Sequence, residues 1–153
     1  MTLSTERLLD EVGWQLLAAL QQDARTPLSE LARRVGLSAP AVAERVRRLE
    51  DAGIIRGYRA ELDLARLGLP LSAWIRLTID GQRDEPFLKH AAQAPEIHSC
   101  DRVTGTDCFV LRVVVSDVAH LERTISALKA YGSPITSLVL SSPVTRRDVE
   151  GPR

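Results

Sequence analysis

Apolar residues recur at helical spacing through the first third of the chain and then change to an alternating pattern. Spacing by three or four residues is typical of the single buried stripe of an amphipathic helix. Three such stripes follow one another: Leu9, Val12, Leu16, Leu17 and Leu20; Leu28, Leu31, Ala32 and Val35; and Val42, Val46 and Leu49. The pattern therefore predicts three short helices. From residue 71 to residue 79 apolar and polar residues alternate almost without fault, which predicts a half-buried strand.

Capping residues mark the expected ends of the three helices. Thr26 and Pro27 are typical of an N-cap followed by proline at the first helical position. Gly36 is expected to end the second helix and Ser38 to cap the third. Gly53 is expected to end the third helix. Two helices joined by a tight turn that contains glycine indicate a helix-turn-helix.

The second half of the chain predicts strands and helices in the order β-α-β-β-α-β. The expected elements are strand 71–79, helix 85–94, strands 97–103 and 108–115, a helix from Asp117 that stops at Gly132, and a last strand 136–142. A further strand is expected at 58–62, where apolar and polar residues alternate. Residues 104–107 form a hairpin loop in which Gly105 supplies the turn. This order is a ferredoxin-like layout.

These elements predict an α+β chain of two domains. Residues 1–56 are expected to form a winged helix-turn-helix DNA-binding domain, and residues 57–70 a linker strand and hinge. Residues 71–142 are expected to form a ferredoxin-like βαββαβ domain for dimerisation and effector sensing. Residues 143–153 have the composition of a polar, partly disordered tail.

The distribution of charge points to the third helix. The chain has 20 basic and 20 acidic residues, and this zero net charge argues against indiscriminate nucleic-acid binding. Residues 28–59, however, hold seven arginines against four acidic residues, a net charge of +3. An α-helix fits the major groove, where its first residues reach base edges. The residues left to meet DNA, once the buried stripe is removed, are Ser38, Pro40, Ala41, Glu44, Arg45, Arg47 and Arg48.

Different roles are expected within this set. Arg45 and Arg48 are candidates for contacts at or near bases, whereas other arginines contact phosphates and position the protein. Ser38 and the free N–H groups of the first turn suit a phosphate. Glu44 repels phosphate; it can accept from cytosine N4 or orient Arg48 as its i, i+4 partner. The alternative is a solvated helix face with Glu–Arg pairs, but the order of caps and glycine turns favours DNA binding.

Other kinds of site receive little support. No apolar run approaches the roughly 18 residues of a membrane span, and the charged N-terminus is unlike a signal peptide, so we expect a cytoplasmic protein without membrane contact. Cys100 and Cys108 are expected to be small buried thiols. His90, His98 and His120 are scattered, so no metal site is expected. We expect no catalytic residues and no cofactor, because the chain has no nucleophile–base pairing, phosphate loop or carboxylate dyad.

Two stretches resemble one known family. LSELARRVGLSAPAVAERVRRLEDAGIIRGYRAELDLARLG resembles the winged helix-turn-helix and linker strand of the leucine-responsive/asparagine (Lrp/AsnC) regulators. CDRVTGTDCFVLRVVVSD resembles the V-T-G-x-x-D/C-aromatic hairpin of their ligand-sensing domain. The resemblance runs from about Leu9 to Ser142. It implies homodimers, formed through the ferredoxin-like domain, that assemble into tetramers, octamers or open helices. It also implies a small-molecule effector, usually an amino acid, bound between neighbouring dimers.

The resemblance also implies an effector site. Its residues are Asp101, Thr104, Gly105, Thr106, Asp107, Cys108, Thr136 and Ser137. Cys108 stands where the family often has an acid that meets the effector's amino group, which leaves Asp107 or Asp101 as a substitute. Glu44 stands where the family often has a basic residue, so the operator sequence can differ. The loop can also be only a turn, because glycine in a hairpin needs no ligand to explain it.

We therefore predict a sequence-specific transcriptional regulator that binds double-stranded DNA and is tuned by a small molecule, an amino acid by resemblance. One alternative is an architectural DNA-binding protein without an effector. Another is an enzyme similar to the sirohaem decarboxylases that are related to this family. Such an enzyme needs clustered His and Arg to hold many carboxylates, and the three histidines of this chain are dispersed.

Overall fold

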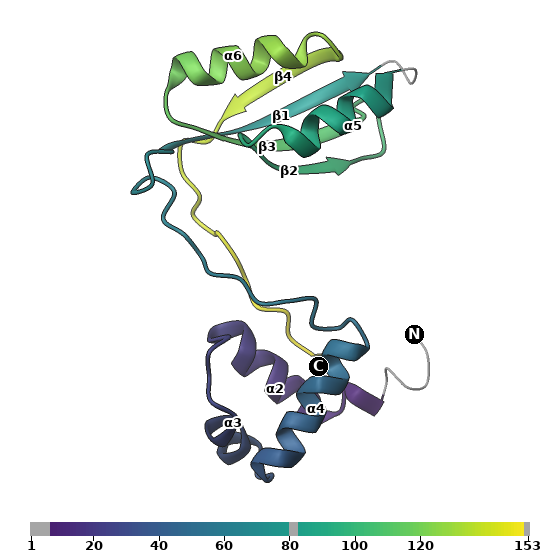
Figure 1. Ribbon diagram of the computed structural model, residues 1–153, viewed down its shortest axis with the longest axis vertical. Helices are drawn as coiled ribbons and strands as arrows, with labels where there is room; N and C mark the ends of the chain where they lie inside the picture. The colour runs from purple at the N-terminus through teal and green to yellow at the C-terminus, as the bar shows by residue number, and fades with distance from the viewer. Residues whose placement is uncertain (1–6, 80–82, 152–153) are drawn as a thin grey trace. The chain divides into compact units, whose positions relative to one another are not determined.

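The computed structural model describes residues 7–79 and 83–151 (Figure 1). The described residues form two compact units. One unit ends at Glu61 and also contains the chain from Val144 onward, and the other spans Leu62–Pro143. The chain therefore passes between the two units twice, once after Glu61 and once after Pro143.

The first unit contains the three predicted helices, α2 (Glu11–Gln22), α3 (Leu28–Val35) and α4 (Ala39–Asp51). The cap at Ser38 is confirmed, since its side chain accepts from the N–H of Ala41 at 3.4 Å. Gly36 ends α3 with φ 68°, in the left-handed region that favours glycine. The predicted cap at Thr26 is wrong: Pro27 is the N-cap, and the Thr26 hydroxyl donates to the carbonyl of Asp23 instead.

The core of this unit is built from most residues of the predicted stripes, but Leu9 and Leu17 are only half-buried and are not part of it. Leu16, Leu31 and Val42 are almost fully buried, one from each helix. Leu49 is buried as well and places the C-terminal turn of α4. Leu28 departs from the prediction because its side chain is 44% exposed, at the first residue of α3. The face of α4 opposite Val42 and Leu49 is therefore left for another role.

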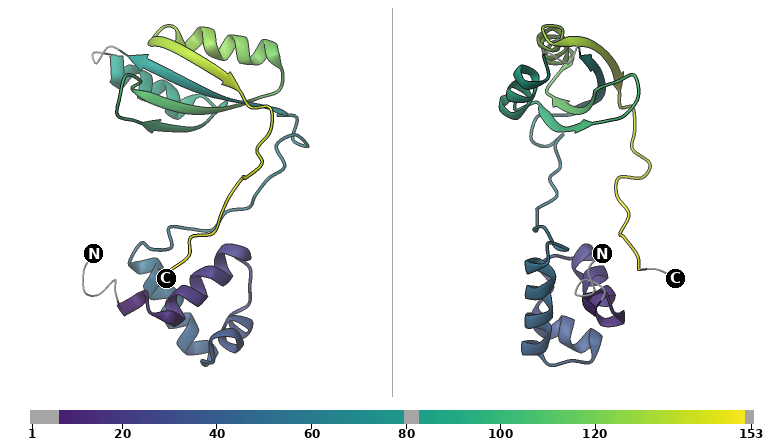
Figure 2. Two further views of the ribbon diagram at one scale, coloured as in Figure 1. Left: turned by 180° about the vertical axis from the view of Figure 1, so that it is seen from behind. Right: turned by 90° about the vertical axis from the view of Figure 1, so that its right-hand side faces the viewer.

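The second unit is an antiparallel sheet of β1 (Leu71–Ile79), β2 (Ile97–Arg102), β3 (Phe109–Val115) and β4 (Gly132–Leu138). The strand order is β2-β3-β1-β4. Helices α5 (Asp84–Gln93) and α6 (Val118–Leu128) cover one face of this sheet (Figure 2). The predicted βαββαβ order and the α+β class are confirmed.

One face of the sheet is buried under the two helices, and the other, called the open face, is exposed to solvent. On the helix-covered face, Phe87 of α5 packs against Phe109 of β3 with ring centroids 4.8 Å apart. Alternate residues of β1 from Ala73 to Ile79 are buried on this face. On the other face, Trp74 is 42% exposed and Ile135 of β4 is 51% exposed. A monomer therefore leaves large apolar side chains on the open face in water.

Two predicted boundaries are wrong by several residues, and one predicted strand does not form. The last strand is Gly132–Leu138 rather than 136–142, and α6 ends at Leu128, so Gly132 opens a strand instead of stopping a helix. Gly132 lies so close to β1 that an added Cβ would be 2.1 Å from the Thr78 carbonyl oxygen. This close approach, rather than a helix end, accounts for the glycine.

The third error is the strand expected at 58–62, where the structure has no regular element. Alternation alone does not make a strand, because the backbone groups need a partner strand. Tyr58 is instead tied to the end of α4, since its hydroxyl donates to Glu50 at 2.9 Å. Burial and the Glu50 carboxylate raise the pKa of Tyr58 to about 12, so this hydroxyl keeps its proton.

Candidate nucleic-acid interface and effector loop

The outer face of α4 is the candidate DNA-binding surface. A helix turns once every 3.6 residues, so positions four and seven or eight apart lie above one another. Pro40, Glu44 and Arg48 therefore form one stripe, and Ala41 and Arg47 flank it. This stripe lies opposite the buried Val42 and Leu49, and Ser38 lies exposed at its N-terminal end.

The charges on this outer stripe are balanced within the protein. Glu44 accepts from Arg47 at 2.9 Å and from Arg48 at 2.9 Å. Arg47 also pairs with Asp51 at 3.0 Å. Hydrogen bonds from Arg47, and then from Arg48, hold the pKa of Glu44 below its usual range. Ion pairs this exposed contribute little stability. DNA phosphates can therefore replace the carboxylates as partners of these guanidinium groups.

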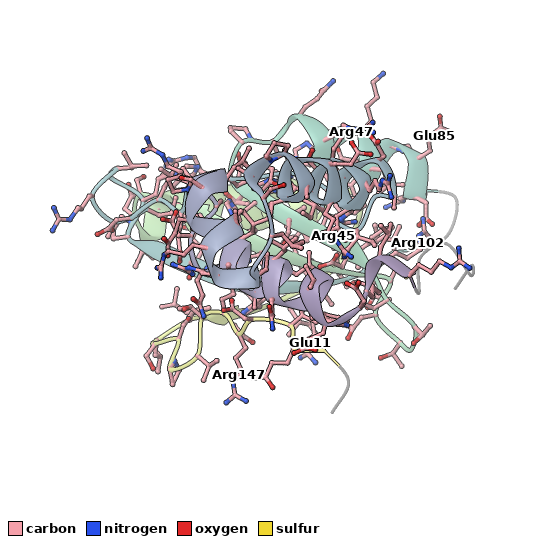
Figure 3. The ribbon with its side chains drawn as sticks, turned by 90° about the horizontal axis from the view of Figure 1, so that it is seen from below. Glu11, Arg45, Arg47, Glu85, Arg102 and Arg147 are labelled. Atoms are coloured by element: carbon pink, nitrogen blue, oxygen red, sulfur yellow. The ribbon has the colours of Figure 1, made fainter. Side chains whose placement is uncertain are left out.

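Arg45 is held differently from the other arginines of α4. Its guanidinium donates to both carboxylate oxygens of Asp10, at 2.8 and 2.9 Å. Figure 3 shows Arg45 on the side of α4 toward α2, whereas Arg47 lies on the other side. The reason is spacing, because Arg45 lies four residues before the buried Leu49 and next to the core stripe. In this structure Arg45 therefore joins two helices, and its predicted base contact stays a prediction.

Asp10 is a functional candidate that the sequence analysis did not single out. Its carboxylate also accepts from the N–H of Gly13 at 2.8 Å and so caps α2. The Arg45 hydrogen bond, with help from Gly13, lowers the pKa of Asp10. An aspartate just before the apolar residues Val12 and Leu16 is an N-cap signal that could have identified it.

Helix α3 repeats the balanced arrangement. Glu30 accepts from Arg33 at 2.7 Å and from Arg34 at 3.0 Å. These two arginines lower the pKa of Glu30 to about 2. The local excess of arginine in the sequence is thus largely neutralised by neighbouring carboxylates.

The candidate effector loop joins β2 to β3. Its neck is closed by Val103, whose N–H donates to the carbonyl of Cys108 at 3.1 Å. Gly105 has φ 113°, a conformation that side chains disfavour. Thr104, Gly105 and Thr106 are exposed and Asp107 is half-buried. The structure thus brings two hydroxyls and one carboxylate together on the loop, while Asp101 lies exposed on β2.

Cys108 fastens this loop to the end of β1. Its backbone N–H donates to Leu77 at 3.0 Å, and its thiol lies 3.3 Å from both the N–H and the carbonyl of Ile79. The Cys108 thiol therefore interacts with the main-chain groups of Ile79. Cys100 is half-buried, and burial, followed by the charge of Asp101, raises the pKa of its thiol.

Thr136 and Ser137 do not join the loop within one chain. Thr136 pairs with Ile75 on the helix-covered face, and Ser137 pairs with Trp74 on the open face. Strand β1 separates both of them from β3. The Thr136 Oγ1 atom is buried and, in the part of the chain that the structure describes, has no hydrogen-bond partner.

Residues 7–79 and 83–151 contain neither a metal-binding cluster nor a membrane-spanning helix. No group of three or more His, Cys, Asp or Glu side chains there could hold a metal ion. None of the helices in these ranges is long and apolar enough to span a bilayer.

A helix-turn-helix with arginines on its last helix, joined to a βαββαβ domain with one open face, defines a class of two-domain DNA-binding regulators. The AsnC-type helix-turn-helix domain matches residues 9–50, and the Lrp/AsnC ligand binding domain matches residues 72–149. The chain belongs to the Lrp/AsnC family of transcriptional regulators.

Curated relatives and solved structures support this assignment over most of the chain. The transcriptional regulator LrpC of Bacillus subtilis is 33% identical over 138 residues, which are 90% of this chain and 96% of LrpC. Its structure matches with a TM-score of 0.86 over 90% of this chain and 99% of that one. The Bkd operon transcriptional regulator of Pseudomonas aeruginosa is 33% identical over 90% of this chain and 95% of its own length.

One similar structure is a complex with an amino acid. A transcriptional regulator from Neisseria meningitidis, in complex with L-methionine, is 30% identical with a TM-score of 0.86. The match covers 92% of this chain and 96% of that protein.

The first prediction concerns the Asp10–Arg45 pair. Asp10→Asn keeps a good N-cap but removes the charge that Arg45 meets, and should lower the free energy of unfolding by at most about 1 kcal/mol. Because the pKa of Asp10 is lowered in the folded chain, this stabilisation is present above the ordinary aspartate pKa and is lost as the pH falls through the lowered value. Urea unfolding of the native and Asp10→Asn chains, repeated from neutral pH to below the lowered pKa, measures the loss of stability and its dependence on pH.

A double variant tests the pairing itself. Asp10→Asn combined with Arg45→Gln should cost no more stability than either change alone, since each removes the same interaction. If Asp10→Asn instead makes the chain bind DNA more tightly, Arg45 is a DNA contact that Asp10 restrains.

The second prediction concerns Glu44. Glu44→Gln removes the carboxylate that holds Arg47 and Arg48, and should strengthen binding to unrelated duplex DNA and steepen its salt dependence. Arg48→Ala should have the opposite effect on both. Fluorescence anisotropy titrations at several salt concentrations measure the affinity and the slope. Equal behaviour of all three chains would mean that this face of α4 does not meet DNA.

Proposed function

We propose that this protein is a homo-oligomeric regulator that binds DNA through α4 and changes its DNA affinity or assembly when an amino acid binds the ligand-sensing domain. The observation that carries the proposal is the exposed stripe of α4. It lies on the last helix of a helix-turn-helix and bears Arg47 and Arg48. Phosphates would replace the carboxylates that hold these arginines in the free chain.

The 104–108 loop is the proposed contact to the effector. An amino acid has an ammonium, which a carboxylate meets, and a carboxylate, which backbone N–H groups meet. The Cys108 thiol is engaged at Ile79, so Asp107 is the proposed partner of the ammonium, with Asp101 as the alternative. The methionine complex of the Neisseria meningitidis relative supports an amino acid as the ligand class.

Dimerisation is proposed through the open face of the sheet. Trp74 and Ile135 are large, exposed and on adjacent strands, where a second copy would exclude water from both. A two-fold dimer would let two α4 helices enter successive major grooves, about 34–36 Å apart. Thr136 and Ser137 remain proposed effector residues only if such an assembly brings another chain to the loop.

Selection of DNA fragments tests the proposed function as a whole. Native protein is mixed with sheared host genomic DNA, with and without the twenty amino acids, and bound fragments are sequenced. The proposal expects a limited set of enriched fragments whose occupancy changes with one or a few amino acids. Uniform recovery of all fragments would favour an architectural protein instead.

The third prediction concerns the effector. Asp107→Ala removes the proposed ammonium partner, and Gly105→Gln forces a side chain into a left-handed backbone conformation. Both should abolish the amino-acid effect on DNA affinity and leave ligand-free DNA affinity within about twofold, because α4 is unchanged. Glu122→Ala, which removes an exposed carboxylate from α6, is the matched control and should respond normally. A response that survives in both loop variants would place the sensor elsewhere.

The fourth prediction concerns assembly. Trp74→Glu places a charge in the proposed interface, where burying it without a partner costs several kcal/mol, and should give monomers. Val118→Glu is the matched control, because Val118 is 68% exposed on α6, away from the open face. Multi-angle light scattering at micromolar concentration should report at least a dimer for the native chain and the control. A native monomer would rule out this interface and the two-fold operator.

A further inference from the structure

The last residues of the chain lie against the outer side of α2. Although the sequence predicted a partly disordered tail, the Val149 N–H donates to Gln21 Oε1 at 2.9 Å and Gln21 Nε2 donates to the Val149 carbonyl at 3.1 Å. One side-chain amide thus pairs with both backbone groups of one residue, as a neighbouring strand would. These two bonds join positions 128 residues apart in the sequence.

A second contact lies two turns along the same helix. Gly151 lies close to the indole ring of Trp14, where an added Cβ would be 2.8 Å from Cδ2 and 2.9 Å from Cγ. No larger residue fits this approach without moving the ring or the tail. The close approach of the tail to the ring therefore depends on the absence of a side chain at position 151.

The two contacts match the geometry of a strand laid along a helix. Trp14 and Gln21 are seven residues apart, so they lie on one face of α2, about 10.5 Å apart along its axis. Val149 and Gly151 are about 7 Å apart in extended backbone. Helical side chains lean toward the N-terminus, so the Gln21 amide reaches back toward Trp14 and closes the difference. The tail runs antiparallel to α2.

This face of α2 is not used by the core. Leu16 and Ala19 turn inward, whereas Trp14 and Leu17 line a hollow of about 1070 Å³ beside the tail. Val149 lines the same hollow. The tail therefore covers apolar surface that α2 would otherwise expose.

We propose that residues 144–151 are a docking segment for the outer face of α2 in the same chain, and that they form a second tether between the ligand-binding and DNA-binding units. The first tether is the linker after Glu61, and the second is the tail after Pro143, where the chain returns to the first unit. Two tethers restrict a domain far more than one. This inference rests on the proposed function: when an effector binds the ligand-binding unit, the tail transmits the resulting change to the unit that contains α4.

Hydrogen exchange of the full chain, without DNA or effector, tests the docking. Gln21→Leu keeps the apolar stem but removes both hydrogen bonds, and Gly151→Leu collides with Trp14. Each should make the amides of 148–151 exchange about tenfold faster. Gln15→Leu is the matched control, since Gln15 lies on another face of α2 and bonds Glu11. Trypsin cleavage after Arg146 or Arg147 should accelerate in the same two variants only.

The outcomes separate the tether from the proposed function. Unchanged exchange in both variants, or protection that falls when the protein is diluted, overturns docking in the same chain. If docking holds, the backbone ¹⁵N relaxation of α2–α4 should report faster, more independent tumbling in Gln21→Leu and Gly151→Leu. Unchanged tumbling overturns the tether.

Measuring DNA affinity with and without an amino acid tests only whether the tail transmits the effect of that amino acid. In the two tail variants the ratio of DNA affinities with and without the effective amino acid should approach one, and a full native ratio overturns transmission by the tail. A native chain that responds to no amino acid defeats the proposed function, whereas the docking and tumbling results still decide the tether.

Discussion

In the DNA-binding unit, helix α4 must pack into the core on one side and contact another molecule on the other. One stripe of this helix must enter the core through Val42 and Leu49, and the opposite stripe must stay free for another molecule. Arg45 lies at the border between the two stripes, and its bidentate pair with Asp10 joins the start of α2 to the middle of α4. Burial fixes how deeply α4 lies in the core, and this pair adds a directional contact between two helices. The N-cap of α2 and the orientation of α4 thus share one carboxylate.

The ligand-binding unit has a comparable centre in β1. This strand pairs with β3 on one side and β4 on the other, and it supplies alternate residues to the core under α5 and α6. Two unusual contacts occur along its C-terminal half. The Gly132 backbone lies against the Thr78 carbonyl, and the Cys108 thiol hydrogen-bonds the Ile79 carbonyl. Both place the neighbouring strands on β1 through backbone groups. The 104–108 loop therefore ends where the Cys108 N–H donates to the Leu77 carbonyl and the Cys108 thiol contacts Ile79.

Much of the fold could be predicted from the sequence, because period and caps are local properties. The stripes of α2, α3 and α4, the cap at Ser38 and the order of helices and strands along the chain all follow from residues close in the chain. The end of α6 and the start of β4 could not, because Gly132 is required by a contact with Thr78, 54 positions away. The candidate DNA-binding surface was visible as exposed arginines, but the partners of those arginines were not. Asp10 and Gln21 meet their partners only after folding.

The path of the chain has a consequence for modularity. Because both Glu61 and Val144 belong to the DNA-binding unit, the ligand-binding domain is, in sequence terms, an insertion between two parts of that unit. Exchange of sensors between relatives by a single crossover in the linker would leave a foreign tail on α2. A tail with a larger residue at position 151 would have to shift, or would have to displace the Trp14 ring. Recombination that preserves this architecture needs two junctions, and the second lies after the last strand of the sensor rather than before its first.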